Sequence, residues 1–338
     1  MKAMAQRTWA PGAPLELLEL PTSVPRRREV RVSVQAIGVN PVDWKMRSHG
    51  PLRWAARLLG PRPPVIVGVD FAGVVDAVGS SVTDLAVGDR VAGGTNFARG
   101  QRGSYADTVV VRRDQVCRVP DSVDITAAAA LPIPGVTAWM SVIDLGRIRR
   151  VPAAERRVLV LGASGGVGQL VVQIAKRENA LVCGVCSSAN VDRVAGLGAD
   201  VVIDYTGGDA LTQARAHGPF SVVVDCAGGY SARRCRALLA PDGRHVMVAG
   251  DDAAALAARV LAPRRSKGIL GRPTGARLAP LLDAVAAGVL RVTIAKAFPL
   301  TDAEEAHRLS RTGRMTGKLL LIPDAVPAPG FERQLGGD

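Results

Sequence analysis

The chain has 338 residues, 48% of them hydrophobic, which is enough to bury two moderate cores, and we expect two domains. No apolar run approaches the ~20 residues that span a bilayer, and the start from Met1 to Arg7 holds no apolar signal segment, so we expect a cytoplasmic protein with no membrane partner. The formal charge is +13, but only 4% of the residues are aromatic and the arginines are spread along the chain, so we expect no nucleic-acid partner.

The first third of the chain has the pattern of short strands punctuated by Gly and Pro. Glu29 to Ala36 alternates between valines and polar residues, which is typical of a half-buried strand. Further strands are expected at 1–7, at 65–78 with breaks at Gly68 and Gly73, after a turn at 88–91, and at 103–110. Many short strands of this kind predict a compact domain that resembles a β-barrel.

From about Ser122 to Gly288 strands alternate with helices. The expected strands are 158–161, 180–186, 201–204, 221–225 and 244–248, and the expected helices are 169–176, 191–198 and 276–287. Continuous apolar strands that alternate with helices indicate a parallel sheet covered on both faces.

After Gly288 the chain returns to strand character. Strands at 291–298 and 317–322 flank a helix that Thr301 is expected to cap, and about the last fifteen residues, rich in Pro and Gly, are expected to form a mobile tail. The two ends of the chain are therefore predicted to form one domain, interrupted by the other. The predicted boundaries are 1–124 plus 289–338 for the first domain and 125–288 for the second.

The run from Val158 to Gly168 joins four β-forming residues to a glycine-rich turn that opens a helix. The turn matches the dinucleotide fingerprint as Ala163-x-Gly165-x-x-Gly168, with alanine in place of the first glycine. A strand, a turn and a helix start in this order bring backbone N–H groups against a pyrophosphate. The sequence thus predicts a dinucleotide site; the alternative is a domain whose glycine turn binds nothing.

The five cysteines are scattered and odd in number, which favours free thiols in a reducing compartment. Cys183 and Cys186 form a CxxC, which could be a redox or metal pair. They fall inside a predicted strand, where residues three apart point to opposite faces, so we expect both to be buried.

With these segments in view, the chain resembles the medium-chain dehydrogenases/reductases, and among them the zinc-independent branch of quinone oxidoreductases and enone (alkenal) reductases. The matching blocks, which span nearly all of the chain up to about Pro323, are 38–45, 68–73, 87–91, 135–139, the glycine turn, 198–205 and 317–318. The resemblance implies a Rossmann doubly wound parallel sheet inserted in a GroES-like β-barrel domain, and a homodimer. The stretch from 251 to 275 matches poorly, and the family would place the dimer edge and one wall of the pocket near it.

Zinc-dependent relatives place a cysteine where Asn40 stands and a His-Glu pair where Val69 and Asp70 stand. A catalytic Zn²⁺ needs three N, S or O ligands, and Asn40 and Val69 do not supply them. The cysteine cluster of a structural zinc is missing too, and none of the four histidines has ligand spacing. We therefore expect no metal, which argues against an alcohol dehydrogenase.

The resemblance also implies site residues. Asn40 and Lys45 are the expected catalytic residues beside the nicotinamide, although Asn40 could be a turn residue before Pro41 and Lys45 a surface lysine. Thr137 matches a nicotinamide contact, with helix capping as the alternative. The complete set of expected cofactor-binding residues is Thr137, Ala163, Ser164, Gly165, Gly166, Val167, Gly168, Ser187, Ser188, Arg193, Tyr205, Cys226, Ala249 and Lys318.

The residues after the second strand of the alternating region favour NADPH. NAD-specific folds place an acidic residue there to bind the ribose 2′-hydroxyl. Here Ser187 and Ser188 follow instead, with Arg193 nearby and Tyr205 after the next strand, and this group suits a 2′-phosphate. Asp192 leaves use of both cofactors possible.

We expect hydride transfer from NADPH to the C=C bond of α,β-unsaturated carbonyls or to quinones, since neither reaction needs a Lewis acid if the acceptor is held in place and hydrogen-bonded. The alternatives are a tailoring enoyl reductase acting on a polyketide or carrier-bound intermediate, and a non-catalytic protein that binds NADPH or RNA. The substrate itself is left open. The segment from Pro51 to Pro64 is either a lid over the cleft or a packed helix.

Overall fold

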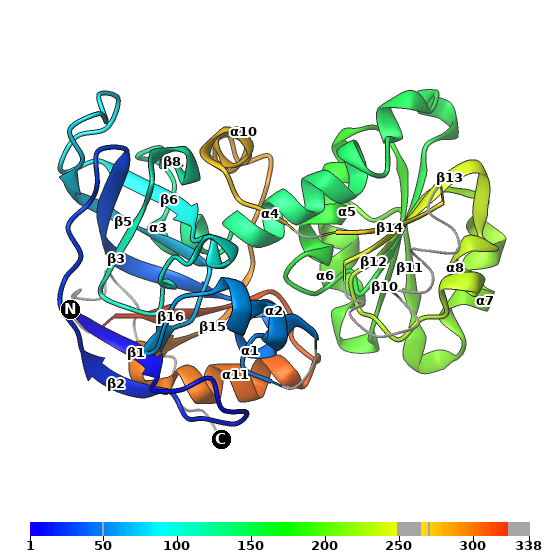
Figure 1. The fold of residues 1–338 in the computed structure, drawn as a ribbon. Coiled ribbons are helices and arrows are strands. Elements are labelled where there is room, and N and C mark those ends of the chain that lie inside the picture. The colour runs from blue at the N-terminus through cyan, green and yellow to red at the C-terminus, as the bar shows by residue number, and fades with distance from the viewer. Residues whose placement is uncertain (49–50, 249–264, 270, 324–338) are drawn as a thin grey trace, which may run out of the picture.

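The computed structural model describes residues 1–48, 51–248, 265–269 and 271–323. Figure 1 shows two bodies side by side, a β-rich body that contains both ends of the described chain and an α/β body built around one sheet. Among the described residues, no helix is both long enough and apolar enough to cross a bilayer.

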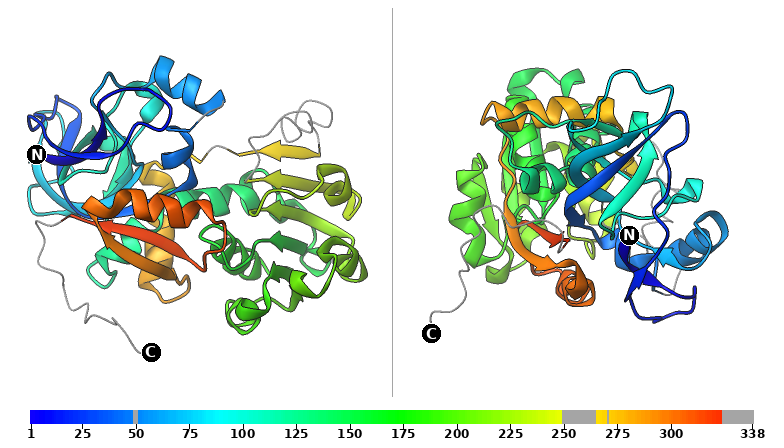
Figure 2. Two further views of the ribbon diagram at one scale, coloured as in Figure 1. Left: turned by 90° about the horizontal axis from the view of Figure 1, so that it is seen from below. Right: turned by 90° about the vertical axis from the view of Figure 1, so that its left-hand side faces the viewer.

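The β-rich body combines strands from both ends of the chain. Its strands are β1 (Lys2–Gln6), β2 (Glu16–Glu19), β3 (Glu29–Val39), β4 (Val65–Ile66), β5 (Asp70–Val78), β6 (Arg90–Gly94), β7 (Thr108–Arg112), β8 (Val116–Arg118), β15 (Ile294–Pro299) and β16 (Lys318–Ile322). The large sheet runs β15-β16-β3-β5-β6-β8, with β7 also paired to β3, and a small sheet runs β2-β1-β4. Because β16 pairs antiparallel with β3, a late segment of the chain belongs to the same domain as its first segments. Figure 2 shows β16 and α11 within this body.

The α/β body has the predicted parallel sheet. Its strands are β9 (Arg157–Leu161), β10 (Leu181–Cys186), β11 (Val201–Asp204), β12 (Phe220–Asp225), β13 (Leu239–Met247) and β14 (Ser266–Gly268). They run in the order β11-β10-β9-β12-β13-β14, and every neighbouring pair is parallel. This is the order of a Rossmann sheet, in which the chain reverses direction across the sheet between the first and fourth strands. The prediction of a Rossmann sheet and a GroES-like partner domain is confirmed, whereas the residue boundaries between the two stay a prediction.

Helices cover both faces of the parallel sheet, and others belong to the β-rich body. The described helices of both bodies are α1 (Pro41–Lys45), α2 (Pro51–Leu59), α3 (Ile125–Ala129), α4 (Pro132–Trp139), α5 (Gly168–Arg177), α6 (Val191–Gly196), α7 (Ala210–Ala214), α8 (Ala232–Arg236), α10 (Gly275–Ala286) and α11 (Ala303–Arg311). Val158 and Val160 of β9 pack into the core that holds α5, whereas Leu159 and Leu161 pack on the other face with α7 and α8. The alternation of side chains along one strand thus supplies two cores.

Three sequence-based expectations about elements were wrong. Gly73 does not break a strand, because β5 runs through it and its missing side chain lets Ser33 of β3 approach; a Cβ at Gly73 would lie 2.0 Å from the Ser33 oxygen. The strand expected at 103–110 begins only at Thr108. Thr301 lies in a 3₁₀ turn, η9 (Leu300–Asp302), and Asp302 is the residue that precedes α11.

Polar contacts join the two bodies at the start of β16. The N–H of Gly317 donates to Ser164 O at 2.9 Å, and Gly317 and Gly165 form a parallel β-bridge. The buried side chain of Gln169, in α5, accepts from the N–H of Thr293 at 2.8 Å and donates to its carbonyl oxygen at 3.3 Å. The β-rich body is therefore hydrogen-bonded directly to the glycine turn of the other body.

Replacing Gly317 by Ala tests this junction. Gly317 has φ +92°, and a Cβ there would lie 2.5 Å from Thr293 O, whereas Gly313 has φ +64° with nothing within 4 Å. Both variants place an alanine in the left-handed backbone region, which destabilises the folded state by about 1–2 kcal/mol. Only in Gly317→Ala must Thr293 also move. We expect Gly317→Ala to lower the free energy of unfolding by clearly more than Gly313→Ala in urea titrations. Equal losses would contradict a tight junction.

Candidate functional site

The predicted cofactor residues gather at one edge of the parallel sheet. Ser187 follows β10, Tyr205 follows β11 and Cys226 follows β12, so all three lie where parallel strands end. The glycine turn follows β9 at the same edge. The sheet reverses its strand order between β9 and β12, and in such folds ligands bind outside the carboxyl ends at this point.

The glycine turn has the shape of an anion cradle. A Cβ at Gly168, the first residue of α5, would lie 2.1 Å from Gly162 O, so the helix start is pressed against the strand end. Gly165 and Gly166 are open by contrast, because a Cβ on either would meet no atom closer than 3.4 Å. Ala163 is fully buried, and its N–H donates to Val185 O at 2.9 Å. The N-terminus of α5 behind an uncovered backbone turn fits a pyrophosphate. Ser164 and Val167 complete this turn.

Hydroxyl groups cluster beyond β10 and β11. Ser188 Oγ lies 2.8 Å from Thr206 Oγ1, and the Asp204 carboxylate accepts hydrogen bonds from the N–H and hydroxyl of Thr206. These bonds hold the pKa of Asp204 below its usual range. Tyr205 is half-exposed beside them, and Arg193 is exposed on the first turn of α6, where it makes no ion pair within the described part of the chain.

A buried cluster of three side chains adjoins the glycine turn from the other domain. Lys318 Nζ donates to Asn40 Oδ1 and lies 3.4 Å from Asp70 Oδ2. Asn40 Nδ2 donates to the same Asp70 oxygen at 2.9 Å, and Lys318 Cδ would lie 3.7 Å from a Cβ at Gly166. All three are at most 4% exposed. Burial lowers the pKa of Lys318, and the charge of Asp70 opposes that shift.

A second buried chain of hydrogen bonds leads away from Asn40. Asp43 Oδ2 accepts from the Asn40 N–H at 2.7 Å and from the Tyr105 hydroxyl at 3.2 Å. Tyr105 Oη lies 2.9 Å from His307 Nε2, and Arg47 donates to His307 Nδ1 at 2.9 Å. Since Arg47 only donates, the neutral ring carries its proton on Nε2 and donates it to Tyr105. Burial and the Arg47 charge lower the pKa of His307 to about 3.

This second chain of residues was not anticipated as part of a site. Asp43 stands in a sequence block used for the family resemblance, but nothing local marks Tyr105 or His307, which come from distant segments. The packing of α11 against α1, β16 and β3 brings His307 to Tyr105. A sequence pattern within one element could not have revealed the group.

The remaining predicted residues have varied surroundings. Lys45 is partly buried at the end of α1, with Nζ 5.7 Å from the centroid of the Trp44 ring. Thr137 is buried inside α4 rather than at its start, so the alternative of a helix cap is wrong. Cys226 is partly buried, and burial raises the pKa of its thiol. Ala249 lies outside the described residues.

The described cysteines and acidic residues do not assemble a metal site. Cys183 and Cys186 are both buried in β10, as expected from their place in a strand. Within the part of the chain that the structure describes, no three His, Cys, Asp or Glu side chains come together as possible metal ligands.

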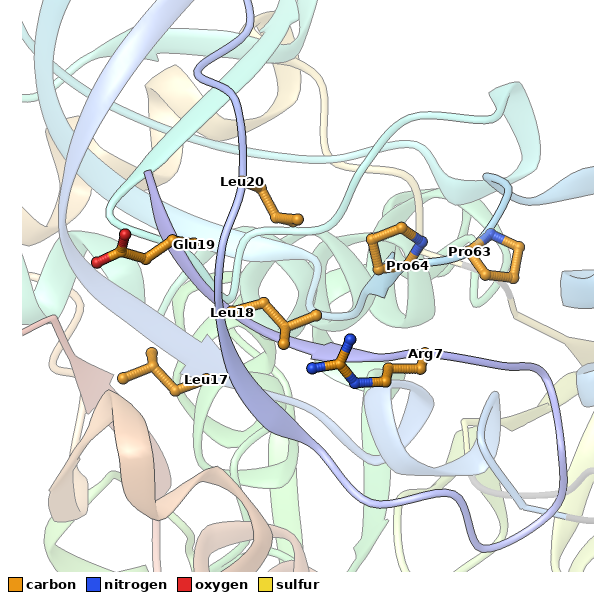
Figure 3. Close-up of a pocket in the computed structure, with 7 residues that line it drawn as sticks. All are labelled: Arg7, Leu17, Leu18, Glu19, Leu20, Pro63 and Pro64. Carbon is orange, nitrogen blue, oxygen red and sulfur yellow. The ribbon is translucent and has the colours of Figure 1, made fainter.

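A groove of about 440 Å³ lies elsewhere, between β2 and the segment that precedes β4. Figure 3 shows its lining, which consists of Arg7, Leu17, Leu18, Glu19, Leu20, Pro63 and Pro64. None of the predicted site residues lines it, so it is separate from the cradle at the edge of the parallel sheet.

Comparison with known proteins agrees with this architecture. Residues 26–121 match the alcohol dehydrogenase GroES-like domain, and residues 197–321 match the zinc-binding dehydrogenase family model. The chloroplast envelope quinone oxidoreductase homolog of Arabidopsis thaliana is 31% identical over 330 residues, covering 96% of this chain and 98% of that protein. The chain belongs to the medium-chain dehydrogenase/reductase family.

Within this family it stands in the quinone oxidoreductase branch. The structure of the quinone oxidoreductase from Coxiella burnetii superposes with a TM-score of 0.83 at 29% identity, covering 95% of this chain and 99% of that one. The mitochondrial NAD(P)H oxidoreductase RTN4IP1 of Homo sapiens is 36% identical over 211 residues, which cover 60% of this chain and 52% of that protein. This medium-chain dehydrogenase/reductase is therefore an oxidoreductase with a nicotinamide cofactor.

The Asp43 carboxyl gives the fold a pH dependence. Burial, with the nearby charge of Asp70, raises its pKa from 3.8 to about 7. The folded state therefore holds this proton more tightly than the unfolded state, and the free energy of unfolding falls as the pH rises from 3.8 to about 7. Asp43→Asn removes this titration. We expect the free energy of unfolding of the variant, relative to that of the wild type, to rise over that pH range by at least about 1.4 kcal/mol, the equivalent of one pKa unit. Urea titrations at several pH values measure this difference.

Asp84 supplies a control of opposite sign. Its hydrogen bond with Arg113 holds its pKa below 3.8, so its contribution is present above that pH and is lost as the pH falls. Asp84→Asn should therefore lose stability relative to the wild type at neutral pH. A difference between wild type and Asp43→Asn that does not change with pH would refute the raised pKa.

Proposed function

We propose that this protein is an NADPH-dependent, zinc-independent reductase that transfers hydride to the C=C bond of α,β-unsaturated carbonyls or to quinones. The observation that carries the proposal is the buried Lys318–Asn40–Asp70 cluster beside the glycine turn. It places a lysine ammonium, rather than a set of metal ligands, next to the cradle. The quinone oxidoreductases among the similar proteins support the substrate class. A cytoplasmic location and a homodimer stay predictions.

The side chains at the zinc-ligand positions of the family do not fit a zinc ion. Asn40 and Val69 offer no strong ligand, and Asp70 already accepts from Asn40 Nδ2, from the Ile133 N–H at 3.0 Å and lies near Lys318. A cation at Asp70 would have to displace Lys318 from the pair. The proposed reaction therefore uses no metal.

The chain's own residues can hold the cofactor and the acceptor in place. Gly165 and Gly166 would face the pyrophosphate of a dinucleotide, and Lys318 would lie beside the bound dinucleotide. Reduced nicotinamide, when bound, would supply the hydride and be left oxidised, and a proton from solvent would complete the reduced product. As hydride reaches the acceptor, negative charge grows on the acceptor oxygen, and a nearby ammonium lowers the energy of that state because it is already oriented.

Lys318 and Lys45 are the two ammonium groups that we assign to this role. Both polar atoms of the Asn40 side chain are bonded inside the protein, to Lys318, Asp70 and Gly38, so Asn40 is proposed to position Lys318 rather than to touch the acceptor. Thr137, in α4, is proposed to contact the nicotinamide side.

Turnover of a small substrate panel tests the reaction. We expect NADPH oxidation with a naphthoquinone, an enone and an enal, no NADP reduction with a saturated alcohol, and rates that change less than about twofold after chelation, since no metal ligand set is present among the described residues. Turnover of the alcohol alone, or loss of activity that zinc restores, would sink the proposal. Absence of any turnover combined with salt-sensitive RNA binding would favour a non-catalytic protein.

Arg193 tests the choice of cofactor. A charged hydrogen bond to a 2′-phosphate contributes about 1.5–3 kcal/mol, so Arg193→Ala should raise the Kd for NADPH about tenfold or more and change that for NADH little. Arg233, another exposed arginine of the same sheet domain, is the matched control, and Arg233→Ala should affect neither. Both Kd values can be measured by fluorescence titration of the reduced cofactor. Equal weakening of NADPH and NADH binding by Arg193→Ala would remove the argument for a phosphate pocket.

A further inference from the structure

Helix α2 carries three large apolar side chains that are exposed to solvent. Trp54, Leu58 and Leu59 are 62%, 83% and 52% exposed. Trp54 and Leu58 are four residues apart, so they lie on one stripe of the helix. Exposed large hydrophobic residues scattered singly are ordinary, but three on one helix form a patch that needs a partner.

The opposite face of α2 is fixed to the protein. Ala56 and Arg53 are each 6% exposed, and Arg53 donates to the carbonyl oxygen of Trp9. A Cβ at Gly60, just after the helix, would lie 2.4 Å from the Phe97 ring, and Phe97 packs edge-on against Trp9 with centroids 5.7 Å apart. Helix α2 is thus packed against the Trp9 and Phe97 rings. Its exposed apolar side chains could turn inward only if these contacts were broken.

Positive charge surrounds the exposed stripe. The sequence from Trp44 to Val69 contains five Lys or Arg residues and no Asp or Glu. Arg57 and Arg62 are exposed on α2 and just after it, and Arg99 and Arg102 are exposed in and beside η1 (Phe97–Arg99), the turn that contacts α2. None of these four arginines makes an ion pair with another described residue. The Arg57 guanidinium lies 5.7 Å from the centroid of the Trp54 ring.

We propose that α2 docks this protein on an anionic lipid surface, with Trp54, Leu58 and Leu59 inserted among the headgroups and the arginines on the lipid phosphates. Charge complementarity selects a lipid surface over a neutral apolar partner, because a stripe of Trp and Leu beside unpaired arginines is the pattern of helices that lie in the membrane interface. The absence of a bilayer-spanning segment predicts no membrane partner, but docking at the surface needs no such segment. The proposal is independent of the proposed reaction.

Co-sedimentation of the full chain with large vesicles tests the proposal. We expect binding to vesicles of phosphatidylcholine with phosphatidylglycerol, little binding to phosphatidylcholine alone, and weaker binding as salt increases. Trp54→Ser combined with Leu58→Ser should lower the affinity about tenfold or more. Arg57→Gln and Arg62→Gln should each lower it about fivefold, the equivalent of about 1 kcal/mol per arginine.

Val24 and Arg27 provide the matched control, since Val24 is 78% exposed and Arg27 is an exposed arginine close to it in another part of the surface. Val24→Ser with Arg27→Gln should bind vesicles like the wild type. Circular dichroism and thermal unfolding check that every variant is folded.

Several results would overturn the proposal. One is equal binding to both kinds of vesicle, and another is an equal loss in the control variant, which would show generic attraction to charge. A lower mass of the Trp54/Leu58 variant in light scattering, with vesicle binding unchanged, would assign the stripe to a second copy of the chain. A raised KM for an enone, again with vesicle binding unchanged, would assign it to a lid over the cleft.

Discussion

The arrangement of the site depends on the hydrogen bonds between the start of β16 and the glycine turn. Gly317 binds Ser164, Gln169 binds Thr293, and Thr316 Oγ1 donates to Asn190 Oδ1 at 2.8 Å. Each contact joins the β-rich body to the carboxyl edge of the parallel sheet. The Gly317–Ser164 bond joins two backbone atoms, whereas the other two contacts use the side chains of Gln169, Thr316 and Asn190. Lys318, which follows Gly317, is thereby held beside the glycine turn. A displacement of β16 would therefore separate the Lys318 ammonium from the glycine turn.

The junction also explains why the chain must return to its first domain. β16 pairs with β3, and one residue, Asn40, separates the end of β3 at Val39 from the start of α1 at Pro41. Asn40 therefore reaches Lys318 across two neighbouring strands of one sheet, whereas Asp70 comes from the start of β5 on the other side of β3. Three segments far apart in the sequence meet because antiparallel pairing aligns their ends.

Much of this fold could be predicted from the sequence, because its signals are local. The glycine turn lies between a run of β-formers and a helix, and the strands of the parallel sheet are continuous apolar runs, so periodicity and turn chemistry identify them. The role of Gly73 could not be predicted, because glycine in a strand can mean a break or a close approach of backbone, and only the partner strand decides between them. Asp43, Tyr105 and His307 were missed for the same reason, since their relation exists only after α11 packs against α1.

The ionisable groups of the buried cluster can be understood as one balanced set. Asp70 accepts hydrogen bonds from Asn40 and Ile133 and lies against Lys318, and these contacts favour its charged form against the effect of burial. Asp43 has donors on one oxygen, while its Oδ1 has no hydrogen-bond partner among the described residues, which suits a protonated carboxyl. With Asp43 neutral, the Asp70 carboxylate balances the Lys318 ammonium, and this cluster of described residues holds no unpaired charge. Ionisation of Asp43 would add a second negative charge near Lys318 and reduce the positive potential that the ammonium offers to an acceptor. The protonation of Asp43 therefore links the stability of the fold to the electrostatics of the proposed site.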